Sequence, residues 1–320
     1  MTEKRSNGAI VMLVARVNII SKTLSFFYKN WNNKFRYPIY IHTFGKIIDD
    51  NLKKHINKNI DKNIYFIEIN PKIPKNIDEK DLYYNRTYHD YVKRAFTKKR
   101  LGFLHMCHFL TNINSYGNIG CIGKELKKYD SLMFFDDDIY FKKKIDYDLF
   151  KYLEKYPAVT GFTSKLKRNH NAFAVTENLW DFFKSYIIKN NISPKDKNIK
   201  ESLSDKDDKI INKLDWSCGS FDIYDIKKLE SKNWSEYLNE INSYGGVYKF
   251  RWNNGYTINL FLRTHFDEPL YNLNFLEKGV IDTKIEGSDE FIYHGYKNYY
   301  NSKIFRFFLD LKKKLINLKN

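Results

Sequence analysis

The stretch Ser131-Leu132-Met133-Phe134-Phe135-Asp136-Asp137-Asp138 decides which fold we expect, because an apolar run passes directly into three carboxylates. A short, continuous apolar run is typical of a strand that is buried on both faces, as in a parallel sheet. In open α/β sheets, ligands bind outside the carboxyl ends of the strands. The stretch therefore predicts a buried strand with a charged ligand site at its end.

Apolar runs upstream have the same character. Residues 10–16, 37–43 and 64–69 have the composition of strands, and residues 21–31 between the first two have helical spacing. Strands that alternate with helices indicate a parallel sheet with right-handed crossovers. The predicted fold class is α/β, with a Rossmann-like mixed, mostly parallel sheet flanked by helices.

The alternation continues downstream. We expect helices over residues 88–115 and 147–155 and a strand over residues 158–162. Residues 70–80 carry prolines and lysines and predict an exposed loop. The polar stretch 190–209, rich in Lys and Asp, predicts a mobile loop or the seam of a subdomain.

The composition is that of a globular protein, with 42% hydrophobic, 17% aromatic and 29% charged residues in a chain of 320. A net charge of +17 would suit a nucleic-acid-binding module. The lysines are scattered along the chain instead of being concentrated on one element, so we expect no nucleic-acid partner. A general attraction to anionic ligands, such as nucleotide diphosphates or lipid head groups, remains.

The number of cysteines and the length of the apolar runs indicate the cellular compartment of the protein. Cys107, Cys121 and Cys218 are too few for a disulfide scaffold and lack the spacing of a zinc site. No run of 18 apolar residues suggests a transmembrane helix, and the short run 9–15 lacks the features of a signal peptide. We therefore expect a cytoplasmic protein.

The acidic triplet is the most informative chemical feature. Side chains alternate along a strand, so Asp136 and Asp138 are expected on one side and Asp137 on the other. Two carboxylates on one side form a hard, oxygen-rich site that suits Mn²⁺ or Mg²⁺ bridging a diphosphate. The alternative is a solvated turn or a helix N-cap, where aspartate is also common.

Three later segments carry further polar or aromatic groups. Residues 216–222 form a small-residue turn that leads to Asp222, and residues 245–252 join a glycine pair to Arg251 between aromatic residues. His294 follows an apolar run. Its neutral imidazole would complete the ligand shell of Mn²⁺, or His294 would be a hydrogen-bonded structural residue. The rings that would stack on a sugar, or that fill the core instead, are Trp216, Tyr248 and Trp252.

The tail has its own pattern. Residues 303–320 place apolar side chains on one helical face and lysines around it. Such a helix packs on the domain with solvated lysines outside, or it lies on an anionic membrane surface as a peripheral contact.

Taken in order, these motifs resemble the fungal α-1,2-mannosyltransferases of glycosyltransferase family fifteen, over about residues 10–296. No single motif is specific, and the order of the segments carries the resemblance. The segments that match are the strand 11–15 closing on Arg16, His105-Met106-Cys107-His108-Phe109, the strand 129–135 with its acidic triplet, Ile145-Asp146-Tyr147-Asp148, Ser220-Phe221-Asp222-Ile223, Gly245 to Trp252, and His294.

The resemblance implies a GT-A type fold, Mn²⁺ (or Mg²⁺) as cofactor, GDP-mannose as the nucleotide-sugar donor, and a glycan acceptor. The metal would be ligated by Asp136 or Asp138 and by His294. The donor-binding residues would be Arg16, Asp136, Asp138, Tyr248 and Trp252.

The same resemblance implies transfer with retention of the anomeric configuration and an α-1,2 linkage. Asp222 would be the candidate nucleophile, and Arg251 would hold sugar hydroxyls or stabilise phosphate charge. Two routes stay open for Asp222. It attacks C1 to form a covalent glycosyl-enzyme, or it only stabilises positive charge while the acceptor hydroxyl attacks from the leaving-group face. We favour the second route, because aspartate is one methylene shorter than the family's glutamate.

The predicted organisation is a nucleotide-sugar-binding half (1–140), an acceptor-binding and catalytic half (141–300) and a basic amphipathic helix (301–320). The chain departs from the family pattern at several places. Its three aspartates replace Glu-Pro-Asp, Ser-Phe-Asp replaces Asn-Phe-Glu, His108 replaces an arginine, and Asn253-Asn254 replaces Gly-Asp.

Other functions fit the same residues. A GT-A transferase that uses a UDP-sugar is the first alternative, because no residue selects the base. A non-catalytic protein that binds a carbohydrate or lipid surface is the second. The fungal enzymes are membrane-anchored and disulfide-bonded, so an enzyme of the cytoplasm, bacterial or viral in origin (in the latter case working in the host cytoplasm), fits this chain better.

Overall fold

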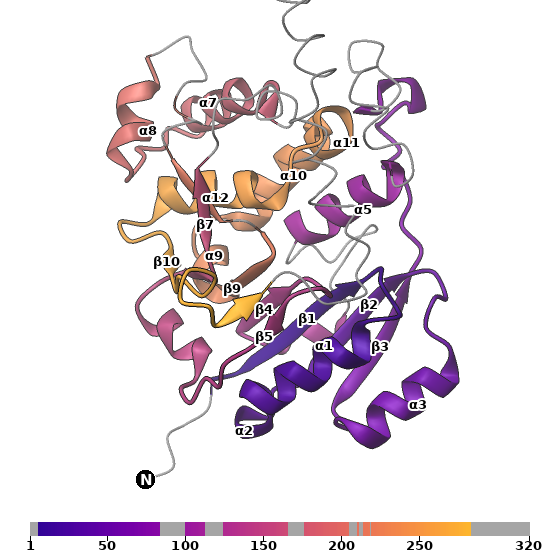
Figure 1. The fold of residues 1–320 in the computed structure, drawn as a ribbon. Coiled ribbons are helices and arrows are strands. Elements are labelled where there is room, and N and C mark those ends of the chain that lie inside the picture. Colours follow the sequence, from indigo (N-terminus) through magenta and orange to yellow (C-terminus); the bar gives the residue numbers. More distant parts are fainter. Residues whose placement is uncertain are drawn as a thin grey trace, which may run out of the picture.

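The protein is described here by a computed structural model that covers residues 6–83, 100–112, 124–165, 176–204, 210, 214–217 and 219–282. Its centre is a seven-stranded sheet (Figure 1). The strands of this sheet, in chain order, are β1 (Gly8–Val14), β2 (Ile39–Phe44), β3 (Ile64–Ile69), β4 (Ser131–Phe135), β6 (Ala158–Thr160), β9 (Phe221–Asp225) and β10 (Tyr271–Asn272).

Two small two-stranded sheets complete the β-structure of the described residues. They pair β5 (Tyr140–Phe141) with β11 (Ile281–Asp282), and β7 (Thr163–Lys165) with β8 (Asp215–Ser217). The described helices are α1 (Ile20–Phe27), α2 (Asn33–Phe35), α3 (Asp50–Asn59), α5 (Arg100–Thr111), α7 (Leu179–Lys189), α8 (Lys197–Ser202), α9 (Ile226–Glu230), α10 (Trp234–Tyr244), α11 (Gly246–Phe250) and α12 (Asn254–His265).

The central sheet is mixed and mostly parallel, which confirms the predicted fold class. Its strand order is β10-β6-β9-β4-β1-β2-β3. β1 pairs in parallel with β2 and β4, β2 with β3, and β6 with β10. β9 is antiparallel to both of its neighbours, β4 and β6.

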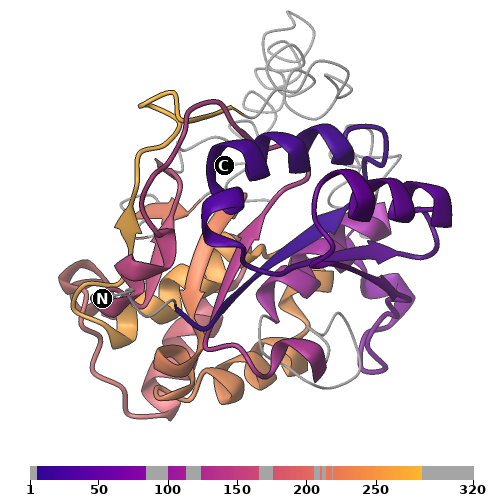
Figure 2. The same cartoon turned by 90° about the horizontal axis from the view of Figure 1, so that it is seen from below.

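Two hydrophobic cores cover the two faces of this sheet. Along β1, Ala9 and Val11 face one core, and Ile10 and Met12 face the other, as expected for side chains that alternate along a buried strand. The first core includes residues of α5, α7, α10 and α12, and the second includes residues of α1 and α3. Figure 1 shows the two layers of helices, and Figure 2 shows α1 and α3 in front of the sheet.

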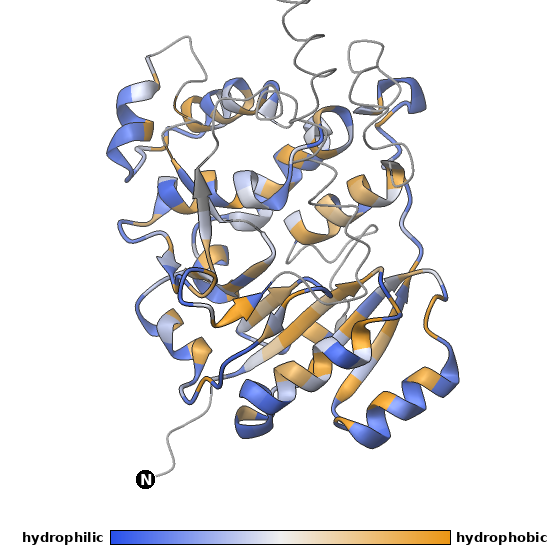
Figure 3. Cartoon of the chain, in the orientation of Figure 1, coloured by the Kyte–Doolittle hydropathy of each residue, from blue (hydrophilic) through white to orange (hydrophobic). Residues whose placement is uncertain are grey.

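Hydropathy follows these layers. In Figure 3 the strands are hydrophobic along most of their length, whereas α3 and α8 are largely hydrophilic on their outer sides. No described helix is both long enough and apolar enough to cross a membrane.

Several predicted elements coincide with observed ones, and some do not. The strands over 64–69 and 131–135 have the predicted bounds. The predicted helix 21–31 keeps α-helical geometry only to Phe27 and continues as a π-helical turn, Tyr28–Asn32. The segment 147–155 is a 3-10 helix, Leu149–Glu154. The described part of the predicted helix 88–115 is α5, with the 3-10 helices Glu79–Asp81 and Lys124–Leu126 before and after it.

The prediction of a loop over residues 190–209 is wrong in part, because α8 lies within it. The Asp196 side chain caps α8 by accepting hydrogen bonds from the backbone N–H groups of Asn198 and Ile199. Ile199 is fully buried and anchors the helix on the first core.

The two predicted halves share one sheet. β1 to β4 come from residues 1–140, and β6, β9 and β10 come from residues 141–300, with β4 and β9 hydrogen-bonded across the boundary. The donor and acceptor roles of the halves stay predictions. The predicted helix 301–320 lies outside the described residues.

Candidate active site

The acidic triplet lies at the carboxyl end of β4, as the sequence predicts. β4 ends at Phe135, and the backbone N–H of Asp136 extends the pairing to β9 by donating to the Ser220 carbonyl oxygen at 2.9 Å. The chain then turns, with the N–H of Ile139 donating to the Asp136 carbonyl oxygen at 3.2 Å. Asp136 therefore lies at the sheet edge where ligands of α/β proteins bind.

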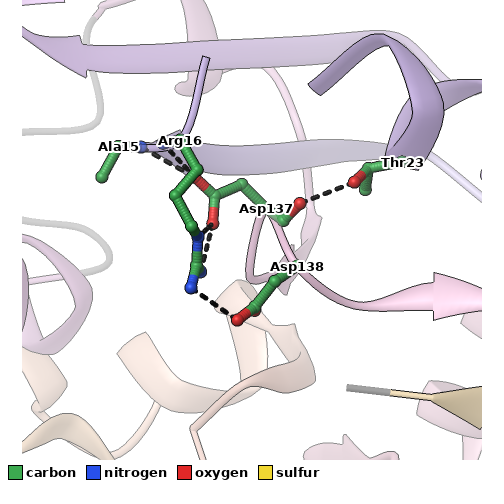
Figure 4. A network of polar contacts seen from close by, with 5 residues as sticks. All are labelled: Ala15, Arg16, Thr23, Asp137 and Asp138. Atoms are coloured by element: carbon green, nitrogen blue, oxygen red, sulfur yellow. Dashed lines mark hydrogen bonds and ion pairs between the residues drawn. The ribbon is translucent and has the colours of Figure 1, made fainter. Parts of the chain in front are cut away.

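Asp137 points along the same edge, toward the residues that follow the parallel strand β1 (Figure 4). Its Oδ2 accepts the backbone N–H groups of Ala15 and Arg16, each at 2.8 Å, and its Oδ1 accepts Nε of Arg16 at 2.7 Å. The Thr23 hydroxyl of α1 donates to the Asp137 carbonyl oxygen at 2.6 Å. Asp137 thus fastens β4, the end of β1 and α1 together.

Arg16 joins the second and third aspartates. Its guanidinium forms ion pairs with Asp137 and, at 2.6 Å, with Oδ2 of Asp138 (Figure 4). Burial lowers the pKa of Arg16, but the carboxylates of Asp137 and Asp138 outweigh this effect and the pKa rises. The predicted role of Arg16 in binding the donor stays a prediction. In the structure its charge balances two carboxylates.

Among the residues that the structure describes, Asp136 has no such ion-pair partner. Burial, followed by the carboxylates of Asp138 and Asp137, raises the pKa of Asp136 to about 8, against the lowering effect of a hydrogen bond from Ser220. Burial also raises the pKa of Asp138. The cluster is therefore short of positive charge, a condition that a divalent cation would relieve.

The donor set fits a hard cation, because carboxylate oxygens are the ligands that Mn²⁺ and Mg²⁺ prefer. Within the described ranges, no three His, Cys, Asp or Glu side chains gather closely enough to hold a metal ion by themselves. A complete shell would need a further ligand, and the predicted one, His294, lies outside the described residues.

Asp222 lies in β9, on the same face of the sheet as Tyr224 and opposite Phe134 of β4. It is only 1% exposed. Its Oδ1 accepts the Ser217 hydroxyl, and its Oδ2 accepts the Tyr224 hydroxyl at 2.9 Å. Burial raises the pKa of Asp222, and the hydrogen bonds from these hydroxyls oppose the shift.

Arg251 occupies the junction between α11 and α12. Its backbone is left-handed, with φ of 61°, and its guanidinium stacks on the Phe103 ring of α5, 4.5 Å from the ring centroid. The glycine pair before it is a packing requirement, because a Cβ on Gly246 would lie 1.9 Å from the Trp252 ring. The predicted segment 245–252 therefore folds into a tight corner that holds Arg251 against α5.

Tyr248 and Trp252 are buried in this corner. The Tyr248 hydroxyl is hydrogen-bonded to Nδ1 of His105 at 2.8 Å, and Nε1 of Trp252 donates to the Glu177 carbonyl oxygen at 2.8 Å. Trp216 is also buried, edge-on to Tyr256. All three aromatic rings pack in the core in the structure, and the prediction that they contact a ligand stays a prediction.

The α5 helix lies beside both charged groups of the site. Burial raises the pKa of the Cys107 thiol to about 12, while the charge of Arg251 lowers it and the charge of Asp136 raises it further. Both charges thus act on one buried side chain. Asp136 and Arg251, although far apart in the sequence, are thus both near enough to α5 for their charges to act on Cys107.

A polar contact between α5 and α10 was not predicted from the sequence. His108 Nε2 lies 3.1 Å from Oδ1 of Asn242, and Asn242 and Asn112 exchange side-chain hydrogen bonds. These contacts hold α5 to α10. The histidines at 105 and 108, one turn apart on a predicted helix, are the signal that would have indicated a polar face on α5.

The chain matches known proteins over most of its length. Residues 1–264 match the family model described as glycolipid 2-alpha-mannosyltransferase. The glycolipid 2-alpha-mannosyltransferase of Saccharomyces cerevisiae is 24% identical over 297 residues, which cover 85% of this chain. The chain spans 64% of that relative's length.

Solved structures show the same fold. Core-mannan synthase A (CmsA/Ktr4) from Aspergillus fumigatus, in a Mn/GDP form, matches with a TM-score of 0.68 at 18% identity, over 85% of this chain and 74% of that chain. The mannosyltransferase Ktr4p from S. cerevisiae matches with a TM-score of 0.65 at 18% identity, over 84% of this chain and 68% of that chain. With the family match over residues 1–264, the fold is of the GT-A type, and the chain belongs to the glycosyltransferase family described as glycolipid 2-alpha-mannosyltransferase.

Proposed function

We propose that this protein transfers a mannosyl group from GDP-mannose to a glycan hydroxyl, with a divalent metal ion, retention of the anomeric configuration and formation of an α-1,2 linkage. Membership of the mannosyltransferase family supports the transferred sugar. The Mn/GDP form of a structural neighbour supports the cofactor and the nucleotide. The observation that carries the proposal is the position of Asp136 at the end of β4, where its carboxyl group is buried beside two other carboxylates and its pKa is raised.

Asp136 and Asp138 are the described residues that would hold Mn²⁺ (or Mg²⁺), with His294 as the further ligand that the sequence predicts. The ion, when bound, supplies positive charge to the departing diphosphate. Asp138 remains 19% exposed beside its pairing with Arg16, so a ligand reaches it from solvent.

Two arginines would act on the donor. Arg16 is 20% exposed and carries a fork of donors that matches phosphate oxygens. Arg251 is mostly buried, so its charge acts through a medium of low polarity, where it attracts phosphate or sugar oxygens more strongly than at the surface. Both arginines would orient the donor and stabilise its negative charge.

Thermal unfolding with a panel of nucleotides and nucleotide sugars, with and without Mn²⁺, tests the proposal. A ligand that binds only the folded state raises the unfolding temperature by mass action. We expect a Mn²⁺-dependent rise with GDP and GDP-mannose and none with UDP or UDP-sugars. A rise with UDP instead would contradict the assignment of GDP-mannose as the donor. No rise with any nucleotide would favour a non-catalytic binding protein.

Product analysis completes the test. Incubation with GDP-mannose, Mn²⁺ and mannoside acceptors should give a new α-1,2-linked mannoside, whose anomeric configuration and linkage NMR reads directly. A β-linked product would contradict retention, and another linkage would contradict the α-1,2 assignment. The cytoplasmic compartment, the absence of a nucleic-acid partner and the membrane contact of residues 301–320 remain predictions from the sequence.

A further inference from the structure

Asp222 lies in the interior of the fold, on a central strand of the sheet. It is the second residue of β9, which lies between β4 and β6, and its register partners are Phe134 and Thr160. Asp222, Ser217, Tyr224 and Thr160 are all buried. A carboxylate in such a place is stable only when hydrogen bonds replace the water that it loses.

Hydroxyl groups supply those hydrogen bonds. Ser217 donates to Oδ1 and Tyr224 donates to Oδ2, and the Thr160 hydroxyl also interacts with the carboxylate. Both carboxylate oxygens are therefore engaged inside the fold. A sugar carbon that approached either oxygen would have to displace a buried hydroxyl and enter the packed interior.

The contact with Ser217 continues into a turn. The Ser217 hydroxyl oxygen accepts the backbone N–H of Gly219 at 3.0 Å, across the turn that leads from β8 to β9. Gly219 has φ of 72°, a left-handed conformation that glycine adopts without strain, and a Cβ there would lie 2.9 Å from the Asn254 side chain. Asp222, through Ser217, therefore holds the backbone N–H of Gly219.

The turn ends at Ser220, which holds Asp136. The Ser220 carbonyl oxygen accepts the Asp136 N–H at 2.9 Å. A chain of contacts thus runs from the interior carboxylate of Asp222 to the backbone of Asp136, whose carboxylate lies at the ligand edge of the sheet.

We propose that Asp222 is a positioning residue, which holds Ser217, Gly219 and Ser220 in place and through Ser220 positions Asp136, and that no covalent glycosyl-enzyme forms on Asp222. This inference rests on the proposed function, because it assigns to Asp136 a role in holding the metal ion. It also assigns a different role to the residue that the family resemblance marks as the candidate nucleophile.

Two substitutions separate positioning from nucleophilic attack. Asp222→Asn keeps an oxygen that accepts the Ser217 hydroxyl, and the Tyr224 hydroxyl can rotate to accept the new amide group, because a phenol both donates and accepts. Ser217→Ala removes the link between Asp222 and the turn while it leaves the carboxylate in place. Ser185→Ala is the matched control, since Ser185 is exposed on α7 and bonds only within its own helix.

The primary readout is the affinity for Mn²⁺, measured from the EPR signal of the free ion during titration. For Asp222→Asn we expect an affinity within about threefold of the wild type and turnover reduced by no more than about tenfold. For Ser217→Ala we expect the affinity to fall by about 10–100-fold, as is usual when support for a metal ligand is lost. The Ser185→Ala control should match the wild type, and circular dichroism should show all variants folded.

Three results would overturn the inference. One is a loss of turnover of about a thousandfold or more in Asp222→Asn with unchanged Mn²⁺ affinity, as removal of a nucleophile predicts. Another is a mannosyl adduct on an Asp222 peptide in mass spectra of the quenched enzyme. The third is wild-type Mn²⁺ affinity in Ser217→Ala. A wild-type protein that binds no Mn²⁺ would instead overturn the proposed function, and this inference with it.

Discussion

Arg16 lies with its guanidinium between two carboxylates that differ in their access to water. The Asp137 side chain is 3% exposed, whereas that of Asp138 is 19% exposed. A buried charge that loses its partner costs far more than an exposed one. The two neighbouring aspartates therefore have different tasks: Asp137 stabilises the fold, and Asp138 is available to a ligand.

Asp137→Asn should lower the free energy of unfolding by about 3 kcal/mol, because it leaves the partly buried Arg16 without its main counter-charge. Asp138→Asn should lower it by less than about 1 kcal/mol and should abolish the Mn²⁺-dependent rise in unfolding temperature with GDP. Urea denaturation and thermal unfolding measure the two effects. The exposed Asp146→Asn serves as the control for both. Equal losses of stability in the two site variants would contradict this division.

Arg251 combines a mostly buried charge with a left-handed backbone. That backbone costs a residue with a Cβ roughly 1–2 kcal/mol, whereas glycine adopts it freely. An arginine at such a position implies that its side chain contributes something that glycine would not. In the structure this contribution is a cation stacked on Phe103 at the junction of α11 and α12.

Arg251→Gly and Arg251→Ala remove the same guanidinium and differ in backbone freedom. Turnover should fall by about a hundredfold or more in both, if the cation stabilises charge on the donor. The glycine variant should be more stable than the alanine variant by about 0.5–1 kcal/mol, since glycine's greater freedom in the unfolded chain offsets part of the relief of strain. Equal turnover in wild type and variants would exclude a role for Arg251 in transfer.

At the scale of elements, α8 shows how a polar segment becomes ordered. Asp196 caps the helix and also forms an ion pair with Arg263 of α12, at 2.8 Å, with both side chains largely shielded from water. The backbone N–H of Asp196 donates to the Arg263 carbonyl oxygen at 2.9 Å. One aspartate thus starts α8 and fastens it to α12.

Asp196→Ala should lower the free energy of unfolding by about 2 kcal/mol, from the lost cap and the lost partner of Arg263. Mn²⁺-dependent binding of GDP should be unchanged, because α8 contributes no residue to the site. Glu201→Ala on the same helix removes only an exposed pair with Lys197 and should change stability by less than about 0.5 kcal/mol. Similar effects of the two substitutions would mean that Asp196 acts as an ordinary surface charge.

The bounds of helices and strands were predictable from the sequence where a buried apolar run alone determines them. The strands 64–69 and 131–135 coincide with prediction because their apolar runs end sharply. α8 was missed because its order depends on one cap and one buried isoleucine among charged residues, which leaves no apolar periodicity. The helix after β1 was predicted, but its π-helical end was not, because that irregularity has no pattern in the sequence.

Site residues were predictable where position in a strand determines them, and not where long-range contacts do. The place of Asp136 followed from the apolar strand before it. The pairing of Asp137 with Arg16 joins residues 121 positions apart. The enclosure of Asp222 depends on the pairing of β9 with β4 and β6, which places Phe134 and Thr160 beside it, and on the contact with Ser217 of β8.

At the scale of the whole molecule, histidines shielded from water contribute to the response to acid. Burial lowers the pKa of His42 to about 4 from an ordinary value of 6.5, and it lowers the pKa values of His108 and His265 to about 4 as well. Below pH 6.5 the unfolded chain binds protons at these rings that the folded chain does not bind. Their contribution to stability is complete above pH 6.5 and is lost as the pH falls toward 4.

The histidine contribution to the free energy of unfolding should therefore decrease between pH 6.5 and 4, by up to about 3 kcal/mol for each such histidine, while the raised pKa values of Asp136 and Asp138 act in the opposite direction over the same range. His42→Leu, whose side chain still packs against Phe109, should make this decrease smaller. His55→Leu, on the exposed surface of α3, is the control for the removal of an imidazole that does not lie in the core. Denaturation curves at several pH values measure the slope, and an unchanged slope in His42→Leu would contradict the argument.

The place of β9 has a consequence for synthesis. β9 lies between β4 and β6, yet it follows both of them in the chain. On a ribosome that has released only the first 160 residues, β4 and β6 have no strand between them, and β4 presents an apolar edge. Unpaired apolar edges are sites of aggregation, so the nascent chain depends on prompt elongation or on chaperones until residue 225 has emerged.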